Sequence, residues 1–113
     1  MTIQITAATD WYVAAPVSAT DPVSGPINLA GDAVSFAFVP EPKRGWEANN
    51  PPQPTASQWV VGELEGSLPQ FYARILVGPT GAVALVPGRY LCWVQIADTP
   101  ETPQVMFDVL EVL

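Results

Sequence analysis

Apolar and polar residues alternate with a period of two in short runs along most of the chain, and proline, glycine, asparagine or aspartate separates the runs. This alternation is typical of β-strands that bury one face. The 3.6-residue period of a helix is nowhere sustained, because prolines interrupt most windows long enough for one. The pattern predicts about seven to nine short strands in a sandwich or barrel. The predicted strands cover residues 2–7, 11–17, 27–29, 33–39, 58–64, 71–77, 82–86, 89–97 and 105–112.

The last two predicted strands form a hairpin with an unusually apolar second face. If Tyr90 and Cys92 point inward on one strand, and Val105, Phe107 and Val109 on the other, the alternate residues point outward. The outward positions then include Leu91, Trp93, Met106, Leu110 and Val112. A solvated sheet face is normally polar, and a large exposed apolar patch marks an interaction site. The alternatives are that the parity differs by one residue or that the N-terminal segment folds across this face.

Residues 40–56 contain five prolines, which exclude a central strand or a helix there. A loop of this length is usually functional, and Trp46 in its middle favours an ordered, packed loop. Lys43, Arg44 and Trp46 are therefore a second candidate interface, and the alternative is that Trp46 only caps the core. Residues 1–15 are either an N-terminal arm that reaches a neighbour or an edge strand of the same domain.

The segment Gly88-Arg89-Tyr90-Leu91-Cys92 resembles the tyrosine corner of immunoglobulin-like domains, in which a Tyr two residues before a Cys opens the penultimate strand. The resemblance covers about residues 33–113 and implies an antiparallel β-sandwich. It also implies that Trp59 is the core Trp and that Phe36 or Phe38 replaces the missing partner cysteine. Cys92 is then a core residue, because a buried free cysteine behaves as a small apolar side chain.

Composition narrows the classes of function. The 113 residues suit one domain, residues 1–113, that buries roughly two-thirds of its unfolded surface. The net charge is −7 with only four bases, which argues against binding nucleic acid or an anionic membrane surface. We find neither a signal peptide nor an apolar run of ~20 residues, so we expect folding in a cytoplasm.

The residues that most often carry catalysis are scarce. The chain has no histidine and one cysteine, which removes the usual nucleophile pairs and zinc sites. Glu63 and Glu65 are two residues apart on a strand and form a carboxylate pair of the kind that hydrolyses glycosides; two solvated acids are the favoured interpretation. Asp98 and Glu101 match no calcium-ligand spacing. We therefore expect no enzymatic activity, no cofactor and no metal.

A second resemblance comes from four short motifs. They are Trp-Val-x-Gly-Glu-Leu at 59–64, Gly-Pro-x-Gly at 78–81, Pro-Gly-x-Tyr at 87–90 and Asp-x-Pro-Glu-x-Pro at 98–103. In this respect the chain resembles structural proteins of tailed bacteriophages, namely capsid decoration proteins and the N-terminal sandwich of baseplate and minor tail proteins. The resemblance implies a virion accessory protein, assembled in the host cytoplasm, that docks on a major capsid or tail protein.

Three alternatives remain open at this point. The first is that the chain is a minor tail or baseplate component, which is nearly as well supported as capsid decoration. The second concerns the oligomeric state, because the chain either forms a homo-oligomer or docks as a monomer. The alternative from another class is a carbohydrate-binding or adhesion module, in which a sugar stacks on exposed rings of Trp46, Trp93 and Tyr72. A coplanar exposed set of these rings favours sugar binding, and burial of such surfaces against another subunit favours assembly.

Overall fold

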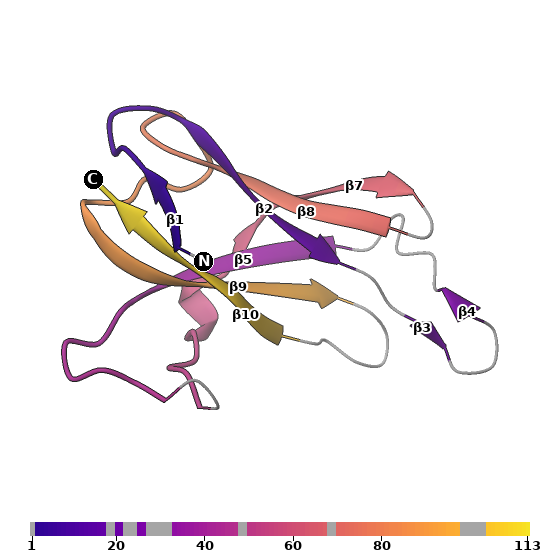
Figure 1. Ribbon diagram of the computed structural model, residues 1–113. Helices are drawn as coiled ribbons and strands as arrows, with labels where there is room; N and C mark the ends of the chain where they lie inside the picture. Colours follow the sequence, from indigo (N-terminus) through magenta and orange to yellow (C-terminus); the bar gives the residue numbers. More distant parts are fainter. Residues whose placement is uncertain are drawn as a thin grey trace.

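The structure of the protein is a computed structural model that describes residues 2–17, 20–21, 25–26, 33–47, 50–67, 70–97 and 104–113. These residues form two sheets packed as an all-β sandwich (Figure 1). The larger sheet contains, in spatial order, β1 (Thr2–Ile5), β10 (Gln104–Val112), β9 (Gly88–Ala97), β5 (Ala33–Pro40) and β6 (Val60–Val61). The smaller sheet contains β2 (Trp11–Val17), β8 (Gln70–Val77) and β7 (Glu63–Ser67). A separate pair consists of β3 (Thr20–Asp21) and β4 (Gly25–Pro26).

The strand order in each sheet matches that of an immunoglobulin-like sandwich. Such domains place strands B, E and D side by side in one sheet and strands C′, C, F and G in the other. Here β2, β8 and β7 take the positions of B, E and D, while β6, β5, β9 and β10 take those of C′, C, F and G. β1 pairs in parallel with β10, so residues 2–5 form an edge strand and not an arm. The predicted fold class is therefore confirmed.

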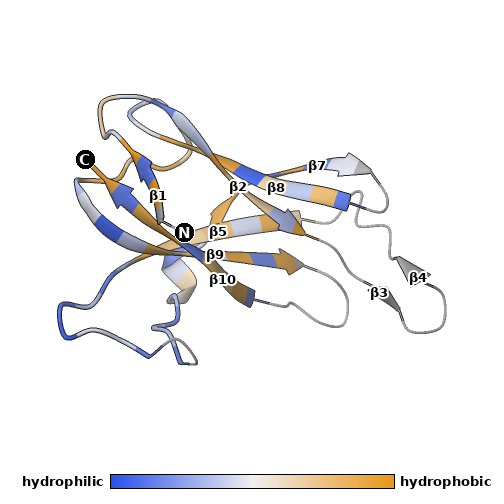
Figure 2. Ribbon diagram, in the orientation of Figure 1, coloured by the Kyte–Doolittle hydropathy of each residue, from blue (hydrophilic) through white to orange (hydrophobic). Residues whose placement is uncertain are grey.

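The main core lies between the two sheets, where the inward residues of both meet. Alternation along β2 and β8 buries every second residue, and Figure 2 shows hydrophilic and hydrophobic bands along β8. Full burial of an aliphatic or aromatic side chain contributes roughly 1.5–3 kcal/mol, so this interior is the main source of stability. Its largest fully buried side chains are Phe36, Phe71, Ile75, Leu110 and Val13.

Gly62 is the point where the chain leaves the larger sheet and enters the smaller one. β6 ends at Val61 and pairs with β5, whereas β7 begins at Glu63 and pairs with β8. A Cβ atom on Gly62 would lie 2.7 Å from the Phe36 ring and 2.8 Å from the Arg74 carbonyl oxygen. The one strand predicted for residues 58–64 is therefore two short strands, because the chain changes sheet at Gly62.

Two other predicted strands differ from the structure. In the predicted strand at 82–86, only Val83 is bridged, to Val77, because the segment loops back onto the end of β8. The predicted strand at 27–29 lies outside the described residues. The predicted terminal hairpin is present, with β9 and β10 antiparallel, but a bulge between Met106 and Asp108 shifts their register.

The tyrosine corner is formed at the start of β9. The Tyr90 hydroxyl donates a hydrogen bond of 2.8 Å to the Val86 carbonyl oxygen, just upstream, as in immunoglobulin-like domains. Cys92 is fully buried two residues later. Burial, followed by the charge of Asp108, raises the pKa of its thiol to about 12. The thiol is therefore neutral at ordinary pH and acts as a small apolar core residue.

Two fold markers lie elsewhere than the resemblance implied. Trp59 follows the short 3-10 helix η1 (Ala56–Gln58) and packs on the outer face of the larger sheet, so it is not the core Trp of strand C. Phe36 and Phe38 are core residues, but they lie on β5, which is strand C, and Phe38 pairs with Cys92 in the same sheet. The missing cysteine partner would come from β2 instead. The misplacement arises because the proline-rich loop follows strand C and not strand B.

Candidate functional site

The apolar outer face of the larger sheet is covered by the chain itself. Leu91 and Trp93 do point away from the other sheet, as the parity predicts, yet Leu91 is fully buried and Trp93 is 6 % exposed. Trp46 from the proline-rich loop and Trp59 after η1 pack against them. The side chains in this outer cluster are Ala37, Val39, Leu91, Trp93, Trp46, Trp59, Met106 and Val109. The prediction of an exposed apolar patch here is therefore wrong.

Leu110 and Val112 point in the opposite direction from the prediction. Both are buried in the main core between the sheets, together with Ile5 of β1. The cause is the bulge between Met106 and Asp108, which inserts an extra residue and reverses the parity of β10 after it. Only Met106 of the three predicted β10 residues is on the outer face, where it is half-buried against the outer cluster.

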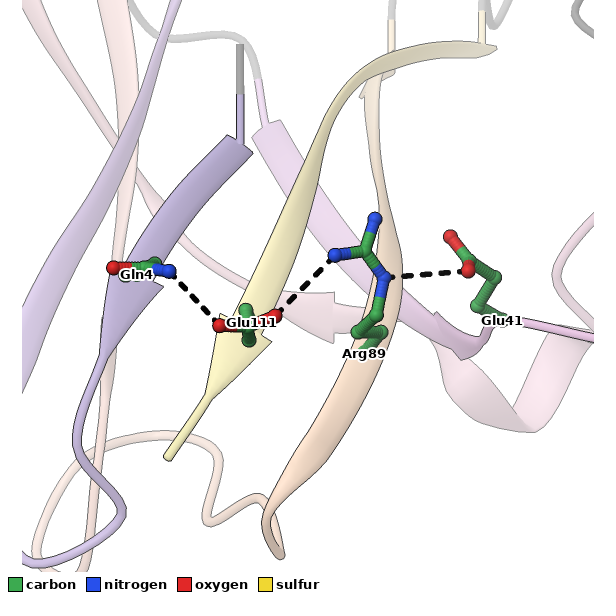
Figure 3. Close-up of polar contacts among 4 residues, drawn as sticks. All are labelled: Gln4, Glu41, Arg89 and Glu111. Atoms are coloured by element: carbon green, nitrogen blue, oxygen red, sulfur yellow. Dashed lines mark hydrogen bonds and ion pairs between the residues drawn. The ribbon is translucent and has the colours of Figure 1, made fainter.

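A row of polar side chains borders the outer cluster at one end of the larger sheet. Arg89 donates to Glu111 and Glu41, at 3.3 Å in each case, and Gln4 donates to Glu111 at 2.9 Å (Figure 3). These residues come from β9, β10, β1 and the position after β5, so the row crosses four adjacent chain segments. Because the ion pairs are solvent-exposed, each adds at most about 1 kcal/mol. Their main effect is to fix the side chains at the rim of the cluster.

The proline-rich loop presents its two bases at a turn. Lys43 and Arg44 are exposed, and the turn is closed by a hydrogen bond of 3.1 Å from the Gly45 N–H to the Pro42 carbonyl oxygen. Trp46, next along the chain, is half-buried in the outer cluster. The structure thus separates the three predicted loop residues: Trp46 closes a core, and Lys43 and Arg44 extend into solvent.

The outward face of the smaller sheet is not covered by any described segment. We call it the small-sheet face and define it by the alternate residues that point away from the core on β2, β7 and β8. They are Tyr12, Ala14, Pro16, Glu63, Glu65, Gln70, Tyr72, Arg74 and Leu76. Tyr12 and Tyr72 are 53 % and 51 % exposed. Tyr and Arg are enriched in protein interfaces and among their energetically dominant residues, so this face is the candidate docking surface.

Arg74 is held at the centre of the small-sheet face by three neighbours. Its Nε lies 2.8 Å from Glu63 Oε2, a second guanidinium nitrogen lies 2.7 Å from Glu65 Oε1, and its Cζ lies 4.3 Å from the centre of the Tyr12 ring. The hydrogen bond to Glu63, aided by the charge of Glu65, raises the pKa of Arg74 above its ordinary value. The guanidinium is therefore charged, and its neighbours within the smaller sheet hold it in place.

The Glu63–Glu65 pair that the sequence raised as a catalytic alternative is part of this network. Both carboxylates share one guanidinium on an open sheet face. Glycosidase carboxylates instead flank a bound sugar bond from opposite sides. Both carboxylates are exposed to solvent, as in the interpretation that the sequence favoured, and the Arg74 guanidinium lies between them.

The turn after β8 is fastened to the start of β2 beside the small-sheet face. Asp10 accepts hydrogen bonds from the Thr80 hydroxyl and, at 3.0 Å, from the Thr80 backbone N–H. These two hydrogen bonds lower the pKa of Asp10 below its ordinary value, and the bond from the hydroxyl contributes most. The carboxylate is therefore ionised. Gly78 has a φ of +152°, and a side chain there would overlap Asp10. The close approach of Asp10 therefore accounts for the glycine at position 78 of the Gly-Pro-x-Gly motif.

The three rings proposed for sugar stacking do not form one platform. Trp46 and Trp93 belong to the outer cluster of the larger sheet, where Trp93 is buried, whereas Tyr72 is on the smaller sheet. The coplanar exposed set that would favour a sugar-binding module is therefore not formed by these three rings. Sequence reasoning also passed over Tyr12, although the alternation of Tyr12, Ala14 and Pro16 against buried residues of β2 is the signal that would have found it.

Asp98 and Glu101 lie outside the described residues. In the part of the chain that is described, no helix has the length and apolarity needed to cross a membrane. No family model, curated protein or solved structure matches the chain.

Proposed function

We propose that the chain is a non-enzymatic structural protein of a virus particle, and that it docks on a larger subunit through the small-sheet face. The observation that carries the proposal is that the outer cluster is closed by the chain's own tryptophans, while Tyr12 and Tyr72 flank a fixed Arg74 on an uncovered face. A specific contact there buries about 1,000 Å² or more in total.

The strand edges support docking through side chains and not through added strands. β2 is an edge strand and carries Pro16, which lacks the N–H that a new strand needs. β10 extends beyond its pairing with β1 at Gln104–Asp108, and this stretch contains the bulge. Bulges and prolines are common devices that protect sheet edges from pairing.

The proposal of a tailed-bacteriophage particle is supported by the sequence motifs that resemble structural proteins of such phages. We propose capsid decoration first, because the chain is small, and a minor tail or baseplate position second. Purified particles from the source of the gene test this directly. Mass spectrometry is expected to find the chain in stoichiometric amount, and gold-labelled antibody is expected to mark heads. Labelled tails would select the second position, and absence of the chain from particles that otherwise assemble would overturn the proposal.

The docking face is tested with particles made without the chain, to which purified chain is added. We expect saturable binding, and we expect Tyr72→Ser to weaken it about tenfold, because an exposed aromatic anchor typically contributes more than ~1.4 kcal/mol. Val86→Ser is the matched control, since Val86 is 72 % exposed and lies outside the small-sheet face. Equal binding by wild type and Tyr72→Ser would assign the contact to another face.

A further inference from the structure

A pocket of about 240 Å³ lies at one end of the small-sheet face. Tyr12 of β2 and the turn of residues 80–82 line one part of it, Glu63 and the Gly62 crossing line another, and Leu76 of β8 contributes apolar surface. All of its lining residues lie within the described chain. The pocket therefore combines an aromatic ring, an aliphatic side chain and a carboxylate within reach of one bound group.

The main-chain donors around this pocket are already used. The Thr80 N–H and hydroxyl both donate to Asp10. The N–H groups of Gly81 and Ala82 donate to carbonyl oxygens at 3.2 Å and 2.9 Å, and the Gly62 N–H donates at 2.9 Å to a carbonyl oxygen of β5. An anion or a neutral sugar needs donors from its site, and these four residues have none to spare.

Apart from the Tyr12 hydroxyl, which can donate or accept, the remaining polar capacity of the pocket belongs to acceptors. Glu63 Oε2 receives the Arg74 Nε, and among the described residues no donor is paired with Oε1. Glu63 and Glu65 share a single guanidinium, that of Arg74. Asp10 is bonded to Thr80 of the turn and has no cation partner among the described residues, so this region carries excess negative charge. A group with several donors, a positive charge and an apolar stem complements such a lining.

We propose that this pocket receives a Lys or Arg side chain of the docked subunit. The stem lies along Tyr12 and Leu76, and the charged end donates to the open oxygen of Glu63. The identity of the carrier as a virion subunit rests on the proposed function, whereas the preference of the pocket for a cation does not. The net charge of −7 adds long-range attraction to a basic partner surface, which is screened as salt rises.

The pocket is tested by NMR titration of the ¹⁵N-labelled chain with N-acetyl-arginine amide. We expect saturating shifts at the amides of Gly62, Glu63, Gly81 and Ala82, and little shift with N-acetyl-leucine amide or methyl glucoside. Glu63→Gln keeps the shape of the side chain and is expected to weaken binding at least fivefold. Glu47→Gln is the matched control, because Glu47 is an exposed acid on the proline-rich loop.

The outcomes separate the two proposals. Absence of saturable shifts with the arginine probe, or equal shifts with methyl glucoside, overturns the cation pocket whatever the particle experiments show. A Glu63→Gln chain that loses the probe but binds particles as wild type does overturns the role of the pocket in docking. Absence of the chain from particles overturns the proposed function alone. Retention of the wild-type spectrum elsewhere shows that Glu63→Gln remains folded.

Discussion

Tyr90 fastens the start of β9 through a single hydrogen bond to the Val86 carbonyl oxygen. We predict that Tyr90→Phe lowers the free energy of unfolding by about 1 kcal/mol, the usual net value of one such bond. Urea denaturation measures the loss. Tyr72→Phe is the control, because Tyr72 is half-exposed and its hydroxyl has no partner among the described residues. Equal stability of Tyr90→Phe and wild type would show that the corner is held by ring packing alone.

Cys92 makes stability depend on alkaline pH. The folded chain retains the thiol proton up to about pH 12, whereas the ordinary pKa is 9.0. Between these values the unfolded chain binds fewer protons than the folded chain, so stability falls as pH rises, by at most about 1.4 kcal/mol per pH unit.

Urea denaturation below pH 9 and at steps above it tests this dependence. Cys92→Ala is expected to remove the decline that begins near pH 9. It should keep a weaker decline at higher pH, because burial also raises the pKa of Tyr90. Parallel curves for wild type and Cys92→Ala would show that the thiol does not titrate differently in the two states.

At the scale of elements, alternation predicted strands well and their sheet membership poorly. It placed residues 11–17 and 33–39 on strands within one residue of β2 and β5. β2 buries every second residue, and β5 directs Val34, Phe36 and Phe38 into the main core. It directed Leu110 and Val112 outward, because a period of two carries no sign of a bulge that interrupts it. It also could not show that Trp59, between η1 and β6, packs over the outer face of the larger sheet, since an apolar run looks the same in both places.

Gly62 offers the sharpest test of the crossing between the sheets. A Cβ there would overlap the Phe36 ring and the backbone of β8, and neither can move without disturbing a sheet. We predict that Gly62→Ala lowers the free energy of unfolding by about 2 kcal/mol, the range seen for overpacked sites. Val61→Ala is the neighbouring control, because Val61 is 73 % exposed. Thermal and urea unfolding measure both, and matched stabilities would show that the crossing has room.

At the scale of the whole molecule, the two outer faces of the sandwich differ in their exposure to solvent. One apolar face is closed by Trp46 and Trp59, and the other is left open with aromatic and charged side chains. The sequence predicted an apolar outer face on the terminal hairpin, and Leu91 and Trp93 do form one. The sequence could not show that other parts of the same chain bury this face, because the residues that cover it are about 30 to 45 positions away along the chain.

This coverage predicts the state of the isolated chain in solution. With the outer cluster closed, Pro16 on the edge strand β2 and a net charge of −7, we expect a monomer of 12.1 kDa by light scattering after size exclusion. Trp46→Ala removes part of the cover over Leu91 and Trp93, so this variant is expected to self-associate and to bind more of a hydrophobic dye. Lys43→Ala, in the same loop but exposed, is expected to remain monomeric. A stable wild-type oligomer, unaffected by salt, would instead mean that the small-sheet face or another surface first binds a second copy of the chain.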